Sequence, residues 1–285
     1  DLVKPYNGKV LTMTPAYSHF LHACTYNQVQ LVCSPLQKKD SGFEIDFDDF
    51  DKKASDPDVK MLMLCNPHNP TGRLWTEAEL QHIAQTCEKH GLWIVSDEIH
   101  CDLLRTGLKH IPMGKIMPDY DRLVTCMSAS KTFNLAGLCF SDIIIRNAEE
   151  RKRFISRDKT RSAINPLSLA AHQAAYQEGS QWLNELKAYL DGNLNFVKEF
   201  LEVNIPSASF QMPEATYFAW VDFSKTLPGA GDLSLFFANN AGVLLEGGNS
   251  LFVGNAEGYV RLNLAMPKAM VKLGMERIAE AISSS

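Results

Sequence analysis

Residues 59–72 read VKMLMLCNPHNPTG, a mostly apolar run that stops at a proline and passes directly into polar residues. The pattern occurs twice more: LWIV at 92–95 leads into SDEIH at 96–100, and LVTCM at 123–127 leads into SASKTFN at 128–134. Strands that are apolar on both faces and lie far apart in the sequence are typical of a parallel sheet covered on both sides. The sequence therefore predicts an α/β fold, a mostly parallel sheet with helices on both faces.

A helix is expected between the first two of these runs. TEAE at residues 76–79 has the pattern of a capping box, in which the Thr76 hydroxyl and the Glu79 carboxylate each accept from the other residue's backbone N–H. Apolar residues then recur at helical spacing, and Gly91 is a suitable C-terminal stop. This segment predicts the connection that joins two parallel strands.

The second half of the chain has a different pattern, with two long amphipathic helices followed by strands and shorter helices. The expected helices are 167–177, 181–203, 233–240 and 268–282, and the expected strands are 216–223 and 259–265. We expect a large domain over residues 1–182 and a smaller α+β domain over residues 183–285.

Composition narrows the class of protein. Of the 285 residues 45% are hydrophobic and 21% charged, which excludes a disordered chain. The net charge is −5 and the basic residues are scattered, so we expect no nucleic-acid partner. No apolar run approaches the roughly 20 residues that span a bilayer, so no membrane partner is expected. The seven cysteines include no C-x-x-C pair, which favours reduced, buried thiols in a cytoplasmic protein over disulfides or a metal site.

The chemistry-bearing residues follow the three strand ends. In an open parallel sheet, that rim is where ligands bind. It carries Asn69, Asp97 and Lys131, which are costly to bury alone. A lysine for a Schiff base, an aspartate to pair with a protonated ring nitrogen, hydroxyls for a phosphate and an asparagine for a phenolate oxygen together suit pyridoxal phosphate.

The three motifs, in this order and spacing, resemble the fold-type I pyridoxal-phosphate enzymes of the class I/II aminotransferase superfamily. TPAYSHF at 14–20 and GYVRLN at 258–263 extend the resemblance almost from end to end. The resemblance implies that Lys131 forms the covalent link to the cofactor and moves the substrate's α-proton. It also implies that Asp97 keeps the pyridine nitrogen protonated, that Asn69 binds the ring oxygen, and that His100 stands near that oxygen, where many relatives have a tyrosine.

The remaining implied roles concern the rest of the cofactor and the substrate. Tyr17 would stack on the ring, Ser128 and Ser130 would bind the phosphate, and Arg261 would bind the substrate's α-carboxylate. The resemblance also implies a homodimer, because sites of this type are completed across a dimer.

Two departures from the superfamily pattern refine the expectation. The position eight residues after the lysine, usually an arginine for the phosphate, is Cys139, expected to be an inert buried thiol. In lacking this arginine, the sequence resembles the cystathionine β-lyase branch of MalY and PatB type. The segments PEATY at 213–217 and WLNELKAYLDGN at 182–193 also resemble that branch. In addition, relatives carry an earlier segment with a glycine-containing loop, so we expect this chain to be a truncated or processed fragment.

The resemblance therefore implies a C–S β-lyase that cleaves L-cystathionine or related cysteine S-conjugates to a thiol, pyruvate and ammonia. An aminotransferase with the same cofactor is the first alternative, because the same carbanion can be reprotonated on the cofactor. A non-catalytic regulatory or binding fragment is the second. His68, His100 and Asp102 could suggest a metal site, but no motif supports one and none is expected.

Overall fold

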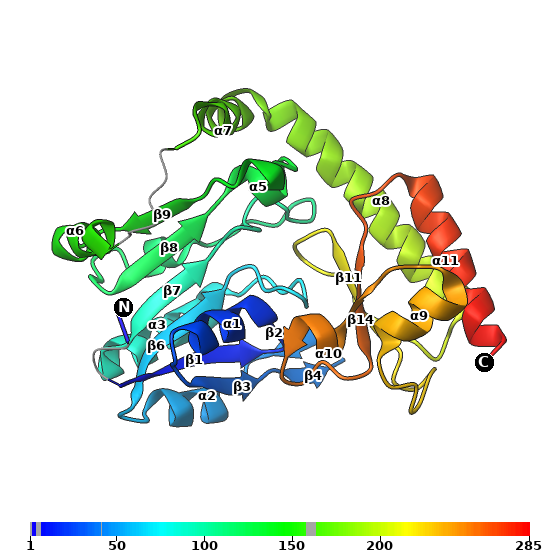
Figure 1. Cartoon of the computed structure of the whole chain (residues 1–285), viewed down its shortest axis with the longest axis horizontal. Coiled ribbons are helices and arrows are strands. Elements are labelled where there is room, and N and C mark those ends of the chain that lie inside the picture. The colour runs from blue at the N-terminus through cyan, green and yellow to red at the C-terminus, as the bar shows by residue number, and fades with distance from the viewer. Residues whose placement is uncertain (1, 4–6, 41, 158–163) are drawn as a thin grey trace.

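The computed structural model describes residues 2–3, 7–40, 42–157 and 164–285. Its first part is built on a six-stranded sheet with the strand order β3-β1-β6-β7-β8-β9 (Figure 1). Neighbouring strands pair in parallel, apart from the antiparallel pair β8 and β9. The strands are β1 (Lys9–Thr14), β3 (Leu31–Pro35), β6 (Val59–Cys65), β7 (Trp93–Asp97), β8 (Leu123–Met127) and β9 (Asp142–Ile145). The expected mostly parallel sheet is confirmed, and β1 and β3 were not part of the prediction.

One face of this sheet packs against α2 (Phe47–Ala54) and α3 (Glu77–His90), and fully buried side chains such as Leu62 and Ile94 fill the core between them. The capping box that opens α3 is present: Thr76 Oγ1 accepts from the Glu79 backbone, and Glu79 Oε2 accepts from the Thr76 backbone. Apolar burial of this kind contributes about 25 cal/mol per Å² and is the main force that holds the helices on the sheet.

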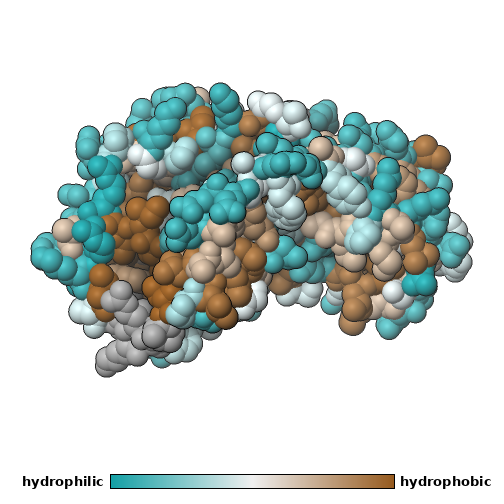
Figure 2. All heavy atoms as spheres, turned by 90° about the horizontal axis from the view of Figure 1, so that it is seen from above, coloured by the Kyte–Doolittle hydropathy of each residue, from teal (hydrophilic) through white to brown (hydrophobic). Residues whose placement is uncertain are grey.

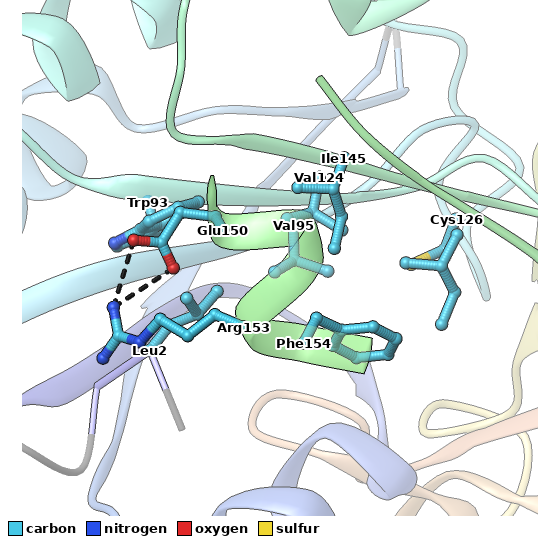
Figure 3. A pocket seen from close by; sticks show the side chains of 10 residues that line it. Leu2, Trp93, Val95, Val124, Cys126, Ile145, Glu150, Arg153 and Phe154 are labelled. Atoms are coloured by element: carbon cyan, nitrogen blue, oxygen red, sulfur yellow. Dashed lines mark hydrogen bonds and ion pairs between the residues drawn. The ribbon is translucent and has the colours of Figure 1, made fainter. Parts of the chain in front are cut away.

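The opposite face is covered by α1 (Ser18–Tyr26) on one side and α6 (Ala148–Arg157) on the other. Between them lies a cavity of about 220 Å³, floored by apolar side chains of β7, β8 and β9 (Figure 3). Its two charged lining residues, Glu150 and Arg153, pair with each other at 3.0 Å. Figure 2 shows brown apolar surface on the half of the molecule that contains the six-stranded sheet. The described residues that line the cavity thus offer apolar contact, and their two charges are paired with each other.

The second part is an antiparallel sheet with the strand order β10-β11-β14-β12. It packs on helices through a separate core that includes Leu194, Val221 and Met275. Its elements are α7 (Pro166–Glu178), α8 (Ser180–Asn204), β10 (Ser209–Phe210), β11 (Phe218–Asp222), α9 (Leu233–Ala241), β12 (Glu246–Gly247), β14 (Tyr259–Asn263) and α11 (Lys268–Ser283). The expected domain boundary at residues 182/183 falls inside α8, which in Figure 1 runs from α7 to the side of the second sheet near α11, and it stays a prediction.

Short elements complete the fold. They are β2 (Ala16–Tyr17), β4 (Gln37–Lys39), β5 (Gly42–Glu44), α4 (Met113–Ile116), α5 (Ala129–Thr132), a 3₁₀ turn at Ala136–Leu138, α10 (Gly248–Leu251) and β13 (Phe252–Val253). In the described ranges no helix combines the length and apolar character needed to cross a membrane.

Residues 213–217 link the two sheets. The backbone N–H groups of Glu214 and Ala215 donate to the carbonyl of Gly72 at 3.0 and 2.9 Å, and Thr216 N donates to the carbonyl of Leu103 at 2.7 Å. Thr216 is fully buried at φ 72°, an unusual conformation for a β-branched residue. It explains why β11 starts at residue 218 rather than at the expected 216.

Gly72 is required where this segment docks. It has φ +70°, and a Cβ there would lie 2.3 Å from Pro213 Cβ. We therefore expect Gly72→Ala to destabilise the protein by about 3 kcal/mol, because steric overlap adds to the cost of a left-handed backbone. Gly107→Ala is the matched control, since Gly107 has φ +86° and an added methyl group there would meet nothing within 4 Å. Thermal unfolding measures both, and equal losses for the two variants would contradict the steric argument.

Candidate functional site

Strand alternation places Asp97 and Glu98 on opposite faces of the sheet. Asp97, the last residue of β7, is flanked in register by Cys65 on β6 and Cys126 on β8. Glu98 is buried on the other side, where its carboxylate accepts from Ser96, from the backbone of Met113 and from His110. Glu98 is therefore satisfied as part of the core, and Asp97 is the carboxylate presented at the rim.

The Asp97 carboxylate is poorly solvated. Burial raises the pKa of Asp97 to about 6. The backbone N–H of Ile99 at 3.3 Å and the positive charge of Lys131 both act to lower it, but burial outweighs them. The Asp97 charge in turn adds to the effect of burial on the Cys126 thiol, whose pKa rises to about 11. A cation placed against Asp97 would be strongly favoured.

Lys131 lies close enough to Asp97 and His100 for its charge to act on both. It belongs to the four-residue helix α5, and its charge lowers the pKa of both neighbours. Thr132 Oγ1 donates to Asp102 at 3.0 Å, which ties α5 to the segment after β7. Lys131 is partly exposed and has no hydrogen bond or ion pair with the described residues. Its ammonium group is thus free to meet a ligand.

His100 is buried with an unsatisfied ring nitrogen. Its Nδ1 has no partner among the described residues, and its ring stands edge-on to Tyr217 and Phe218. Burial, together with the charges of Lys131 and Arg261, lowers its pKa to about 3. His100 is therefore neutral at physiological pH, and a buried polar atom without a partner indicates a place where a ligand is expected.

Asn69 and Arg261 join the two sheets at this rim. Arg261 Nη1 donates to Asn69 Oδ1 at 2.8 Å, although the residues are 192 positions apart. Both are buried, and burial lowers the pKa of Arg261. The guanidinium lies 3.7 Å above the centroid of the Phe218 ring, a close cation–π contact. Because Asn69 accepts through its oxygen, its amide N–H groups remain available as donors.

The residues expected to stack on the ring and to bind the phosphate differ in how far their side chains are already engaged by other residues. The partly buried Tyr17 pairs with Phe252 between β2 and β13 and stacks on His19 at 4.4 Å. The Ser128 hydroxyl accepts from Ser130 N at 3.0 Å and donates to the carbonyl of Phe140 at 2.7 Å, so it caps α5 and has its proton engaged. Ser130 is partly buried. Their roles toward a phosphate stay predictions.

Three observations lay outside the sequence prediction or corrected it. Cys139 is exposed at φ 49°, so the expectation of a buried thiol was wrong: it follows the 3₁₀ turn in a left-handed position on the surface. Glu246 pairs with Arg261, and Tyr217 lies over His100. Neither contact could be found from motifs, although Tyr217 belongs to the PEATY motif, because the first contact depends on strand register and the second on the backbone of Thr216.

The comparisons with known proteins agree with this geometry. The family model described as aminotransferase class I and II matches residues 4–278. The chain is 37% identical to cystathionine beta-lyase PatB of Bacillus subtilis (strain 168), over 96% of this chain and 72% of that protein. It is 33% identical to protein MalY of Escherichia coli (strain K12), over 96% and 70% of the two chains.

Among solved structures, the PLP-bound C–S lyase from Staphylococcus hominis matches with a TM-score of 0.95 and 44% identity, over 100% of this chain and 75% of that one. Cystalysin from Treponema denticola, which contains pyridoxal 5′-phosphate, matches with a TM-score of 0.90 and 32% identity, over 99% and 75%. With a mostly parallel sheet and a family match over almost its whole length, the chain belongs to the aminotransferase class I and II family.

Proposed function

We propose that this chain is a pyridoxal-phosphate-dependent C–S β-lyase that cleaves L-cystathionine or related cysteine S-conjugates to a thiol, pyruvate and ammonia. The observation that carries the proposal is the rim itself: an unpaired lysine whose charge acts on a desolvated aspartate and a buried neutral histidine. The names of the similar proteins, cystathionine beta-lyase and C–S lyase, support the reaction class.

The residues present fit pyridoxal phosphate. Among the described residues, the Asp97 carboxylate accepts one weak hydrogen bond, from the backbone N–H of Ile99, which leaves it available for a ring N–H. The amide N–H groups of Asn69 and the orphan Nδ1 of His100 suit the ring oxygen, and the unpartnered Lys131 suits the aldehyde. Ser130 stands next to that lysine for the phosphate, whereas the Ser128 hydroxyl already donates to the Phe140 carbonyl and would have to turn from it to bind a phosphate. Tyr17 offers a flat ring for stacking.

When bound, pyridoxal phosphate supplies an aldehyde that condenses with amines and a cationic ring that withdraws electrons from the substrate's Cα. We assign Lys131 Nζ to remove the proton from Cα. A lysine is a weak base while it is cationic, so this role needs the neutral amine. Loss of the Cα proton allows the sulfur on Cβ to leave as a thiolate, and water then completes conversion to pyruvate and ammonia.

We assign Asp97 to hold a proton at the ring nitrogen. A carboxylate with a pKa of about 6 is costly as an isolated anion in this position, and a neighbouring N–H cation relieves that cost. Charge stabilisation of this kind is worth more in a desolvated site than in water. Asp97 therefore favours the cationic, electron-withdrawing form of the ring.

We assign Arg261 to the substrate's α-carboxylate. Its guanidinium is buried and fixed by Asn69 and Phe218, and a planar guanidinium can give a carboxylate two parallel hydrogen bonds. Such a pair fixes the direction of the Cα–H bond as well as the charge. Orientation of that bond toward Lys131 is what proton removal requires.

An aminotransferase is the second candidate, and the description of the family model favours it. The two activities differ in what they need. Incubation with L-cystathionine in the absence of any 2-oxo acid should release pyruvate if the chain is a lyase. Turnover only when a 2-oxo acid is added would favour the aminotransferase and overturn the lyase proposal.

We also propose that the protein acts in the cytoplasm as a homodimer. The described cysteines are all free, as expected for reduced thiols, and α7 and α8 expose large apolar side chains that include Leu167 and Trp182. Light scattering on the purified protein measures its mass in solution. A mass of one chain at micromolar concentration would contradict the dimer.

Lys131→Ala should reduce lyase turnover by at least about a thousandfold, because both the covalent link and the base are lost. After borohydride reduction with bound pyridoxal phosphate, peptide mass mapping should find the adduct on Lys131 in the wild-type protein and nowhere in the variant. Lys115→Ala, at an exposed lysine, is the control and should keep both. An adduct on another lysine with turnover intact would refute the assignment.

Asp97→Asn should stabilise the cofactor-free protein at neutral pH. The pKa of Asp97 is about 6 in the native state and has the ordinary value of 3.8 in the unfolded state. Between these pH values the native state binds more protons than the unfolded state, so the wild-type protein loses stability as the pH rises through this window. An uncharged asparagine avoids that loss. At pH 7.5 the variant should gain about 1 to 3 kcal/mol, and the gain should shrink toward pH 4. Lyase activity should fall sharply.

Urea unfolding at several pH values measures this effect. Asp119→Asn is the control, because the Asp119 side chain is 97% exposed and should give no pH-dependent difference. A variant at Asp97 that is less stable than the wild type at pH 7.5, or a difference that does not change with pH, would show that Asp97 is not the desolvated carboxylate described above.

A further inference from the structure

Glu246 lies directly opposite Arg261 in the ladder between β12 and β14. Arg261 Nε donates to Glu246 Oε2 at 2.6 Å, and Nη2 of the same guanidinium pairs with the same oxygen. The two side chains differ in exposure, at 46% for Glu246 and 7% for Arg261. Glu246 therefore reaches in from the surface to the edge of a buried guanidinium.

The hydrogen bonds of Arg261 divide its donors in a defined way. A guanidinium has five N–H donors. Glu246 accepts the Nε–H and forms an ion pair with Nη2, and Asn69 accepts one N–H from Nη1. Among the described residues, each Nη atom thus keeps an N–H without an acceptor, and two N–H groups are what a carboxylate needs for a two-point hydrogen bond. Glu246 therefore holds the Nε side of the guanidinium and leaves donors on both Nη atoms for a ligand.

The surroundings hold Glu246 in place. It stands at the start of the tight turn from β12 into α10, where a Cβ on Gly248 would lie 1.8 Å from the carbonyl oxygen of Ala256. A Cβ on Gly247 would approach Ser234 and Ser250 to 3.1 Å. This close backbone packing fixes the strand that carries Glu246. The guanidinium is then restrained from three separate segments, by Glu246, Phe218 and Asn69.

We propose that Glu246 is a positioning residue for substrate binding, which holds the Arg261 guanidinium at the rotation that presents its two remaining donors to the α-carboxylate. This inference rests on the proposed function, in which Arg261 binds that carboxylate. Without Glu246 the guanidinium can turn about its side-chain torsions, and the two-point contact is replaced by a point charge without direction. The loss should therefore appear in substrate binding rather than in the chemical step.

The test compares Glu246→Ala and Glu246→Gln in the holoenzyme. The glutamine oxygen can still accept from Nε, so the KM of Glu246→Gln for L-cystathionine should stay within about threefold of the wild type. Glu246→Ala should raise KM about tenfold or more, with kcat changed by less than about threefold. Calorimetric binding of L-alanine, which has no leaving group on Cβ, should weaken in parallel. Pyridoxal-phosphate absorbance should be unchanged in both variants.

Glu257→Ala is the matched control, because Glu257 is an exposed glutamate just before the same strand β14 and should behave as the wild type. Unchanged or tighter L-alanine binding in Glu246→Ala would overturn the proposal, as would equal effects of alanine and glutamine. Glu246→Ser is a second variant without reach to Arg261, and loss of folded protein in both short-chain variants would make Glu246 structural and also overturn it.

The measurement of L-alanine binding distinguishes a failure of this proposal from a failure of the proposed function. If the wild type binds L-alanine but produces no pyruvate, the lyase assignment fails while the comparison of alanine binding among the variants still tests Glu246. If the wild type is an active lyase and Glu246→Ala binds L-alanine normally, the positioning role fails alone. No L-alanine binding by the wild type would contradict the carboxylate site at Arg261 and with it the role of Glu246.

Discussion

The carboxylate of Asp97, held at the end of β7 with one weak backbone donor, is the constraint on which the site depends. Burial makes its negative charge costly, and the cation beside it is Lys131, brought there by the next strand along the sheet. The cost is tolerated in the folded state because the rest of the sheet, with its fully buried core, supplies the stability. An under-solvated carboxylate near a lysine that has no ion pair with the described residues suits a ligand that carries both a cationic nitrogen and an electrophilic carbon.

The second half of the site comes from the other sheet. Arg261 crosses from β14 to Asn69 in the loop after β6, and residues 213–217 bind the segments after β6 and β7 through backbone hydrogen bonds. The rim of the first sheet and the Arg261 guanidinium of the second are thus joined by direct contacts rather than by their separate cores. The division suits a reaction in which one set of residues withdraws electrons and another sets the direction of the bond that breaks.

Much of this arrangement could be predicted from the sequence. Each apolar run ends at a polar motif, so the rim with Asn69, Asp97 and Lys131 followed from local pattern and from the way parallel strands end together. Strand alternation, also local, separates Asp97 from Glu98. The pairing of Glu246 with Arg261, 15 positions apart, could not be predicted, because it depends on the register of two strands with a helix between them. The left-handed conformation of Thr216 and the exposure of Cys139 depend on tertiary packing in the same way.

The central claim is that the charges at positions 97 and 131 act on each other at one desolvated site. The most direct test is a carbon-13 NMR titration of the Asp97 side-chain carboxyl in the cofactor-free protein, repeated in Lys131→Ala. Our account predicts a pKa of about 6 in the wild type and a higher pKa in the variant, because the lysine charge that favours the ionised form is gone. A pKa near the ordinary aspartate value of 3.8, or the same pKa in both proteins, would contradict it.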